Sequence, residues 1–226
     1  MDDNPIQRRL KEQVDTFKGA MPIVVALRND ALREQHWKEI KEKINAEFNI
    51  ADPEFTLQSL IDLNAVQFQE DITSISTTAS QEQSLRAQLD QLDLIWRKVD
   101  FVVKVYAKND ALIIDEVDVL FQALDEGLAT INMVLGSRYV KTLRAEAEKW
   151  KKDLFTLTQI VEEWVNCQKQ WIYLENIFAA PDIKKQLPAE SHSFEVVDKF
   201  FKNIMAKIGK LPNAMRFYKQ NVGVLE

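Results

Sequence analysis

A seven-residue repeat of large apolar side chains constrains the fold of this chain more than any other feature of its sequence. One column of the repeat has residues seven positions apart: Leu143, Trp150, Leu157, Trp164, Trp171 and Phe178. A second apolar column precedes it by three residues: Val140, Ala147, Leu154 and Val161. Seven residues make almost two turns of α-helix, so both columns share one helix face. The repeat predicts one long helix over residues 140–178 that buries this face against other helices.

Polar residues interrupt the second column near the end of the predicted helix. Gln168 and Glu175 stand where the repeat would place apolar side chains, next to Cys167. A continuous apolar seam packs tightly along its whole length. The interruption therefore indicates that something polar, mobile or solvent-filled lies against the helix at this point.

One short segment departs from the helical pattern. Residues 101–106 are rich in β-branched and aromatic side chains, and Lys108-Asn109-Asp110 supplies turn residues before the apolar run 112–114. This pattern favours a β-hairpin. A continued helix is the alternative, because Val99, Val103 and Tyr106 also keep a helical spacing.

The remaining signals favour helices and locate their ends. Only five glycines and six prolines occur in 226 residues, which is typical of long helices. We expect Gly19 and Pro22 to end the first helix, Asn29 to cap the second, Thr56 to cap the third, and Ser137 to cap the long one. The sequence thus predicts a mainly α fold: an elongated antiparallel helical bundle with one long helix and a small β-hairpin.

Residues that carry chemistry are sparse. The five glycines never have the spacing of a phosphate-binding P-loop, and only two histidines and one cysteine are present. We therefore expect no catalytic residues, no cofactor and no metal. The formal net charge of −6 disfavours nucleic acid, and no apolar run is long enough to predict a membrane span. An enzyme built in a helical bundle is a remote alternative, and a spectrin-like helical scaffold or tethering module is a closer one.

Several blocks of sequence resemble the linker region of dynein heavy chains. They are LRNDALREQHW at residues 27–37, FTLQSLIDLN at 55–64, GSRYV at 136–140, WVNCQKQWIYLENIF at 164–178 and LPAESHSFEVVDKFF at 187–201. The signature positions are Trp37, Trp150, Trp164, Trp171, Tyr173, Phe178, Leu187, Pro188 and Phe194. Asp30 and Gln35 depart from the family, which often has proline and arginine there. The blocks occur in the family's order and cover nearly the whole chain.

The resemblance implies a mechanical function. A dynein linker is a helical lever arm that lies across a ring of AAA+ ATPase modules, and its bending and straightening drives movement along a microtubule. Residues 1–226 would form a single linker fragment, with candidate subdomains 1–136 and 137–226, excised from a much longer heavy chain. The fragment itself would be non-catalytic and monomeric, without a nucleic acid or membrane partner.

The same resemblance suggests partners and a location. The implied partners are the AAA+ ring modules of the same heavy chain, with the microtubule contacted only indirectly. The amino-acid sequences of the blocks resemble axonemal heavy chains more than cytoplasmic ones, which implies a location in the cytoskeleton of a cilium or flagellum. A bending lever needs a hinge, and the interrupted seam at Cys167, Gln168 and Glu175 is the candidate hinge region.

Overall fold

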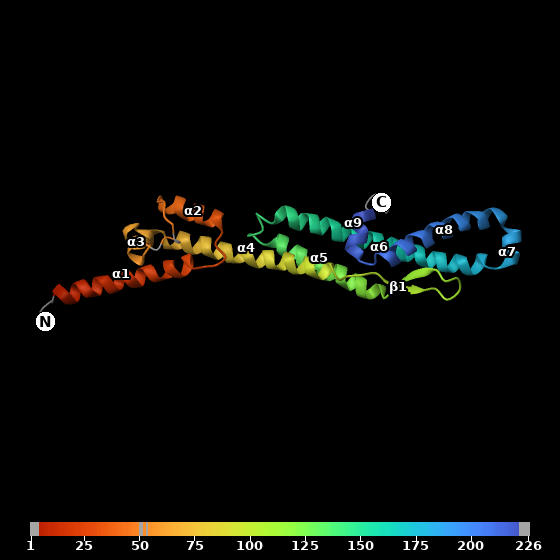
Figure 1. The fold of residues 1–226 in the computed structure, drawn as a ribbon, viewed down its shortest axis with the longest axis horizontal. Helices are drawn as coiled ribbons and strands as arrows, with labels where there is room; N and C mark the ends of the chain where they lie inside the picture. Colours follow the sequence, from red (N-terminus) through yellow and green to blue (C-terminus); the bar gives the residue numbers. More distant parts are fainter. Residues whose placement is uncertain (1–4, 50–51, 53, 222–226) are drawn as a thin grey trace. The chain divides into compact units, whose positions relative to one another are not determined.

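The protein is mainly α, as the sequence predicts (Figure 1). The computed structural model describes residues 5–49, 52 and 54–221. In these ranges the helices are α1 (Pro5–Leu27), α2 (Glu34–Ile44), α3 (Leu57–Asp62), the 3₁₀ helix η1 (Ala65–Phe68), α4 (Gln69–Trp96), α5 (Val117–Gly136), α6 (Arg144–Phe178), α7 (Pro181–Gln186), α8 (Pro188–Lys210) and α9 (Ala214–Asn221). The strands are β1 (Val102–Val105) and β2 (Leu112–Asp115). No helix within the described residues is long and apolar enough to cross a membrane.

The chain forms two compact units, Met1–Ala87 and Gln88–Glu226. Helix α4 contributes its first part to the first unit and its last part to the second. The candidate subdomain boundary after Gly136 lies inside the second unit, between α5 and α6. That boundary stays a prediction.

The first unit packs α1, α2, α3, η1 and the start of α4 around one apolar core. The core residues are Ile23, Ala26, Leu27, Ile40, Ile44, Leu60, Ala65, Ile72 and Ile75. Thr56 caps α3 as predicted, since its side chain accepts a hydrogen bond from the Ser59 N–H at 3.3 Å.

Two predicted helix boundaries in the first unit are wrong. Pro22 lies inside α1, which continues to Leu27. Proline in a helix interior costs about 3 kcal/mol. Ile23, Ala26 and Leu27 just beyond it are buried. Burial of each large apolar side chain contributes about 1.5–3 kcal/mol, which offsets the cost of the proline. Asn29 does not cap α2, whose N-cap is Arg33. The side-chain amide of Asn29 instead donates to Ser76 Oγ at 2.9 Å and to Ser80 Oγ at 2.7 Å, both on α4.

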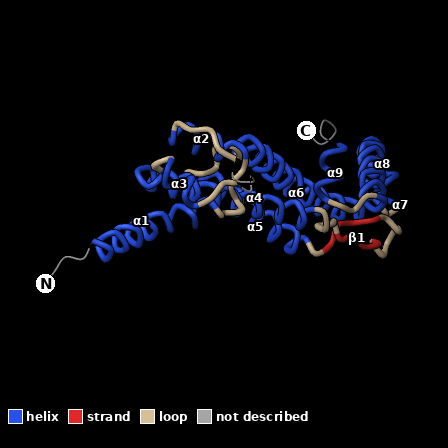
Figure 2. The backbone as a smooth tube through the Cα atoms, turned by 60° about the vertical axis from the view of Figure 1, so that its left-hand side comes forward, coloured by secondary structure: helices blue, strands red, loops and turns tan. Residues whose placement is uncertain are grey.

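The second unit contains the predicted hairpin, so the alternative of a continued helix is wrong. Strands β1 and β2 pair antiparallel, with Val103 opposite Ile114 and Val105 opposite Leu112. The turn between them places Asp110 at φ 55°, a left-handed conformation that Asp tolerates better than most residues. Figure 2 shows both strands in red.

The long helix begins later than the sequence predicts. Helix α6 starts at Arg144, and Ser137 directly follows α5 rather than capping α6. The intervening residues form turns in which the Val140 N–H donates to Ser137 O at 3.3 Å and the Leu143 N–H to Val140 O at 2.8 Å. Val140 and Leu143 are nevertheless buried. The apolar repeat thus identified core positions correctly, although its first turn is not α-helical.

Helix α5 lies beside α6 in the second unit and meets it at a glycine. A methyl group added at Gly127 would lie 3.0 Å from Trp96 Nε1 and 3.2 Å from Leu154 Cδ1, and both of these side chains are buried. A methyl group at Gly136 would meet nothing within 4 Å. The two glycines of α5 therefore differ in how closely neighbours approach them.

We expect Gly127→Ala to destabilise the protein by up to about 2 kcal/mol, because overpacking costs about 1–3 kcal/mol against a gain in helix propensity of about 1 kcal/mol. Gly136→Ala is the matched control and should stabilise by about 0.4–1 kcal/mol. Urea unfolding of both variants measures the difference. Equal stabilisation by the two substitutions would contradict the close approach at Gly127.

Candidate functional site

Three stacked aromatic rings join α6 to α8. The Phe201 ring of α8 lies against the Trp164 ring at a centroid distance of 5.3 Å and against the Trp171 ring at 4.4 Å. The planes differ by 2° and 14°. Trp171 and Phe201 are each 1% exposed, and Trp164 is half-buried. The aromatic stripe of α6 therefore forms core here, and ring stacking adds about 0.5–1.5 kcal/mol per pair beyond burial.

Each tryptophan of the stack also has a partner for its indole N–H. Trp171 Nε1 donates to Asp198 Oδ1 at 3.1 Å, and Lys202 Nζ donates to Asp198 Oδ2 at 2.8 Å. Trp164 Nε1 points to Met205 Sδ at 3.4 Å. The Tyr106 ring from the hairpin meets Trp171 edge to face at 5.7 Å. Trp171 thus contacts both α8 and the hairpin.

Gln168 attaches the hairpin to α6 through its side-chain amide. Its Oε1 accepts from the Ile114 N–H at 2.7 Å, and its Nε2 donates to the Ile114 carbonyl at 2.9 Å. Gln168 is 7% exposed. The side chain thereby pairs with the outer edge of β2 as a neighbouring strand would. The polar element that the interrupted seam indicated is the backbone of the hairpin.

Glu175 and Cys167 lie on the same helix at either side of this contact. Glu175 Oε1 accepts from Asn109 Nδ2 in the hairpin turn at 3.1 Å. Its other carboxylate oxygen is shielded from solvent and has no hydrogen-bond partner among the described residues. Burial raises the pKa of the half-buried Cys167 thiol, so the thiol stays protonated at neutral pH and is a weak nucleophile.

The other signature residues lie in several places. Trp37 packs on the core of the first unit. In the second unit, Lys219 Nζ lies 5.1 Å from the Trp150 ring centroid, and the Phe178 and Phe194 rings stack at 5.2 Å. Tyr173 and Leu187 are exposed, and Pro188 begins α8. The structure therefore gathers Trp164, Gln168, Trp171 and Glu175 around the hairpin and α8, and Phe178 also contacts α8 through Phe194.

Sequence reasoning missed three residues of this site. They are Ile114, Asp198 and Phe201. A signal for Phe201 was present, because Phe194, Phe201 and Ile208 also lie seven residues apart on one helix face. Nothing in the sequence pairs Gln168 with Ile114, which lies 54 residues away along the chain.

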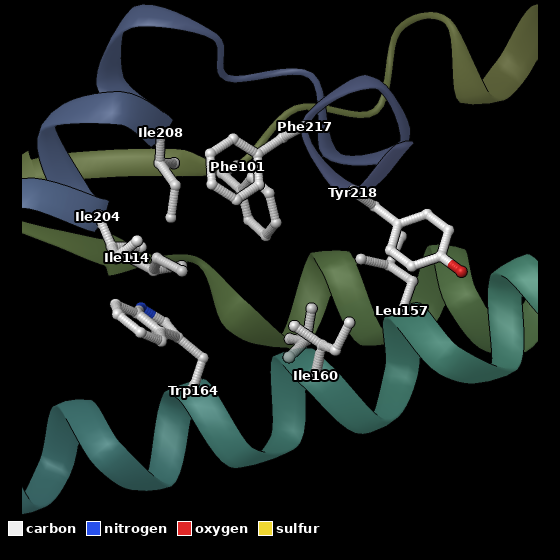
Figure 3. A pocket seen from close by; sticks show the side chains of 10 residues that line it. Phe101, Ile114, Leu157, Ile160, Trp164, Ile204, Ile208, Phe217 and Tyr218 are labelled. Carbon is white, nitrogen blue, oxygen red and sulfur yellow. The ribbon is translucent and has the colours of Figure 1, made fainter. Parts of the chain in front are cut away.

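A small apolar cavity lies beside the stack (Figure 3). It has a volume of about 20 Å³ and is lined by Phe101, Ile114, Leu157, Ile160, Val161, Trp164, Ile204, Ile208, Phe217 and Tyr218. The Tyr218 hydroxyl points away from the other labelled side chains. An apolar space of this size has room for about one water but no polar partners to hold it. In the part of the chain that the structure describes, no three side chains are grouped as metal ligands.

We expect Gln168→Leu to destabilise the protein by about 2–4 kcal/mol, because it leaves two buried backbone groups of Ile114 unpaired. Gln170→Leu, at an exposed position of the same helix, is the control and should change stability by less than about 0.5 kcal/mol. Urea unfolding and amide exchange of Ile114 test this. An unchanged exchange rate at Ile114 would show that the side-chain amide does not hold the strand.

Trp171→Ala should cost about 3–5 kcal/mol, because it removes a buried ring from the stack. Trp171→Phe should cost less, about 1–3 kcal/mol, since it keeps an aromatic ring but leaves Asp198 without the indole donor. Tyr173→Ala, at a side chain that is 68% exposed, serves as the control. A loss below about 1 kcal/mol for Trp171→Ala in chemical unfolding would contradict its role in the core.

Comparison with known proteins identifies, along the whole chain, the family that the sequence blocks resemble. The sequence profile described as "Dynein heavy chain, N-terminal region 2" matches residues 1–226. Human dynein axonemal heavy chain 6 is 37% identical over 224 residues, 99% of this chain. Mouse dynein axonemal heavy chain 2 is 33% identical over 91% of the chain, and the Chlamydomonas reinhardtii dynein gamma chain, flagellar outer arm, is 31% identical over 94%. The match spans 5% of the length of each of these relatives. This chain belongs to the dynein heavy chain family, as part of its N-terminal region 2.

Proposed function

We propose that this chain is the linker of a dynein motor. It acts as a lever arm that bends and straightens over the AAA+ ring and couples ATP hydrolysis to movement along microtubules. The observation that carries the proposal is the end-to-end match to the N-terminal region of dynein heavy chains. Because the chain spans only 5% of its relatives' length, the ATP-hydrolysing ring is assigned to other parts of the heavy chain.

The packing of α6 supports a stiff element. The helix has 35 residues, which at 1.5 Å per residue gives a length of about 52 Å. Ala147, Leu154 and Val161 of its second apolar column are fully buried. Close-packed cores are not continuously deformable, so this part of the helix can transmit force without bending.

The contact between α6 and the hairpin is the proposed hinge region. There the seam is held by two hydrogen bonds between Gln168 and Ile114 and by one that Asn109 donates to Glu175. A hydrogen bond that is exchanged for water contributes only about 0.5–1.5 kcal/mol net. Such contacts open and reform at a lower cost than stacked aromatic core, so bending would begin at Cys167, Gln168 and Glu175. Trp164 and Trp171 would hold the packed clusters beside them.

The proposed partner is the AAA+ ring of the same heavy chain, and the microtubule is contacted only indirectly. The relatives are named as axonemal or flagellar dyneins, and we infer the same location, the cytoskeleton of a cilium or flagellum. This segment itself is proposed to be non-catalytic, because the catalytic modules lie elsewhere in the heavy chain.

The isolated chain should sediment as a monomer and hydrolyse no ATP above a buffer blank. Sedimentation velocity and a phosphate-release assay on the same fraction measure both properties. ATP turnover that follows the monomer peak would overturn the non-catalytic assignment, and a stable dimer would favour a scaffold instead.

A dynein ring from which this segment has been removed tests the lever directly. The isolated chain, added in trans, should bind the ring with an affinity that differs at least tenfold between its nucleotide-free and ATP-bound states, a coupling of about 1.4 kcal/mol. Calorimetry with a hydrolysis-deficient ring measures both affinities. Binding that is equal in the two states, or no binding in either, would refute the lever role.

Cross-linking tests the hinge in a complete motor. Asn109→Cys and Glu175→Cys, combined with Cys167→Ser, place two thiols where the side chains now contact at 3.1 Å. Joining them with a short bis-maleimide should slow microtubule gliding at least twofold and leave basal ATPase unchanged, because it prevents the hairpin from leaving α6. The control pair is Glu163→Cys with Gln170→Cys, both exposed on α6. If the cross-linked motor moved microtubules as fast as the motor without the cross-link, the hinge would lie elsewhere.

A further inference from the structure

Among the residues that the structure describes, the hairpin has one edge that is covered and one that is open. Ile114 directs its N–H and carbonyl toward Gln168, at the outer edge of β2. In an antiparallel ladder the two residues of a pair both point inward or both point outward. Val103 is paired with Ile114, and Val105, two residues on, with Leu112. Their N–H and carbonyl groups therefore face away from β2. The Tyr106 N–H donates to the Ala111 carbonyl at 2.6 Å, so residue 106 points inward, as this alternation requires.

Strand-like pairing already begins on this open edge and then stops. The Phe101 N–H donates to the Pro212 carbonyl at 2.7 Å, and the Ala214 N–H donates to the Val99 carbonyl at 3.0 Å. Asp100 and Asn213 form an antiparallel bridge between these two bonds. The chain then turns into α9 at Ala214. Among the described residues, no hydrogen bond reaches the main chain of Val103 or Val105.

The open edge of β1 has no proline and no bulge, and its protection is limited to one lysine and a short length. Proteins usually protect an exposed edge with proline, a bulge, charged side chains or a very short strand. Strand β1 has the sequence VVKV, with Val102 41% exposed and Val105 58% exposed. Its one charge, Lys104, is bonded to Asp115 at 2.9 Å. Figure 2 shows β1 in red as the labelled strand of the pair.

We propose that the outer edge of β1 at Val103 and Val105 binds an extended segment of a partner polypeptide, which adds to the hairpin as a third strand. Alternating N–H and carbonyl groups at strand spacing are matched by another extended backbone. The exposed valines favour β-branched residues in that segment. The proposal rests on the chemistry of this edge and does not depend on the lever-arm role.

The charge of Lys104 selects against a second copy of this chain. Pairing two β1 strands about a two-fold axis so that both valines bond would place Lys104 directly opposite Lys104 of the other copy. Like charges opposite each other destabilise a strand pair. The partner segment is therefore expected to carry an acidic residue opposite Lys104, flanked by β-branched residues.

The probe is the capped peptide Thr-Val-Glu-Val-Thr-Val, and its control is the same peptide with every backbone nitrogen methylated. The unmodified peptide should bind the chain and slow amide exchange at Val103 and Val105, without a change at Lys104, whose N–H already lies within the hairpin. Methylation should weaken binding at least about tenfold, because each lost hydrogen bond reduces affinity. Equal binding of the two peptides, or no binding of the unmodified peptide at about 1 mM, would overturn the proposal.

Two protein variants complete the experiment. Val105→Pro removes the outward N–H at a position where an edge strand tolerates proline, and it should weaken peptide binding about tenfold. Val105→Thr keeps the N–H and should bind within about twofold of the unaltered chain. Protection of the Lys104 and Ile113 amides verifies that the hairpin remains folded. Protection at Val103 that rises with the concentration of the chain alone would identify a second copy as the occupant and refute a separate partner.

Discussion

The paired hydrogen bonds between the Gln168 side chain and the Ile114 backbone determine how the second unit is built. A buried strand edge is costly unless each N–H and carbonyl finds a partner. A glutamine amide supplies one acceptor and one donor side by side, so it satisfies both groups of Ile114 at once. With that edge paired, the hairpin can bury Ile113 and Ile114 and hold the Tyr106 ring against Trp171. The hairpin therefore requires a polar residue, Gln168, in the otherwise apolar seam of α6 to pair the edge of β2.

The aromatic stack provides the complementary contact on the same face of α6, one turn before and one turn after Gln168. Trp164 and Trp171 precede and follow Gln168 by one turn each, and both stack on Phe201. One short stretch of α6 therefore contacts α8 through stacked rings, and the hairpin through hydrogen bonds and the edge-to-face contact of Tyr106 with Trp171. The two contacts differ in their response to separation, because a stacked core loses its full burial energy whereas hydrogen bonds can be exchanged for water.

The features that the sequence predicted correctly are those set by local geometry. The seven-residue repeat identified the long helix and its buried face, and the β-branched run with Lys108-Asn109-Asp110 identified the hairpin. Predictions of a helix boundary from a single residue failed where tertiary packing overrode the local preference. Pro22 lies inside α1, and Ser137 does not begin α6. For the candidate site, the interrupted seam showed where a polar contact lies. The identity of that contact required the fold, since Gln168 and Ile114 lie 54 residues apart in sequence.

The two kinds of contact also indicate why a lever arm would bend at this point rather than along the rest of α6. Separating a stacked tryptophan from its neighbours costs about 3–5 kcal/mol, while releasing two hydrogen bonds to water costs about 1–3 kcal/mol. A ligand that shifts a conformational equilibrium supplies only the difference in its affinity for the two states. Under the proposed lever-arm role, a nucleotide-driven ring would therefore open the hydrogen-bonded contact with the hairpin first and leave the rings of Trp164, Phe201 and Trp171 together. In the proposed lever, the hairpin is the element that moves, and the aromatic stack is the part of the arm that carries the load.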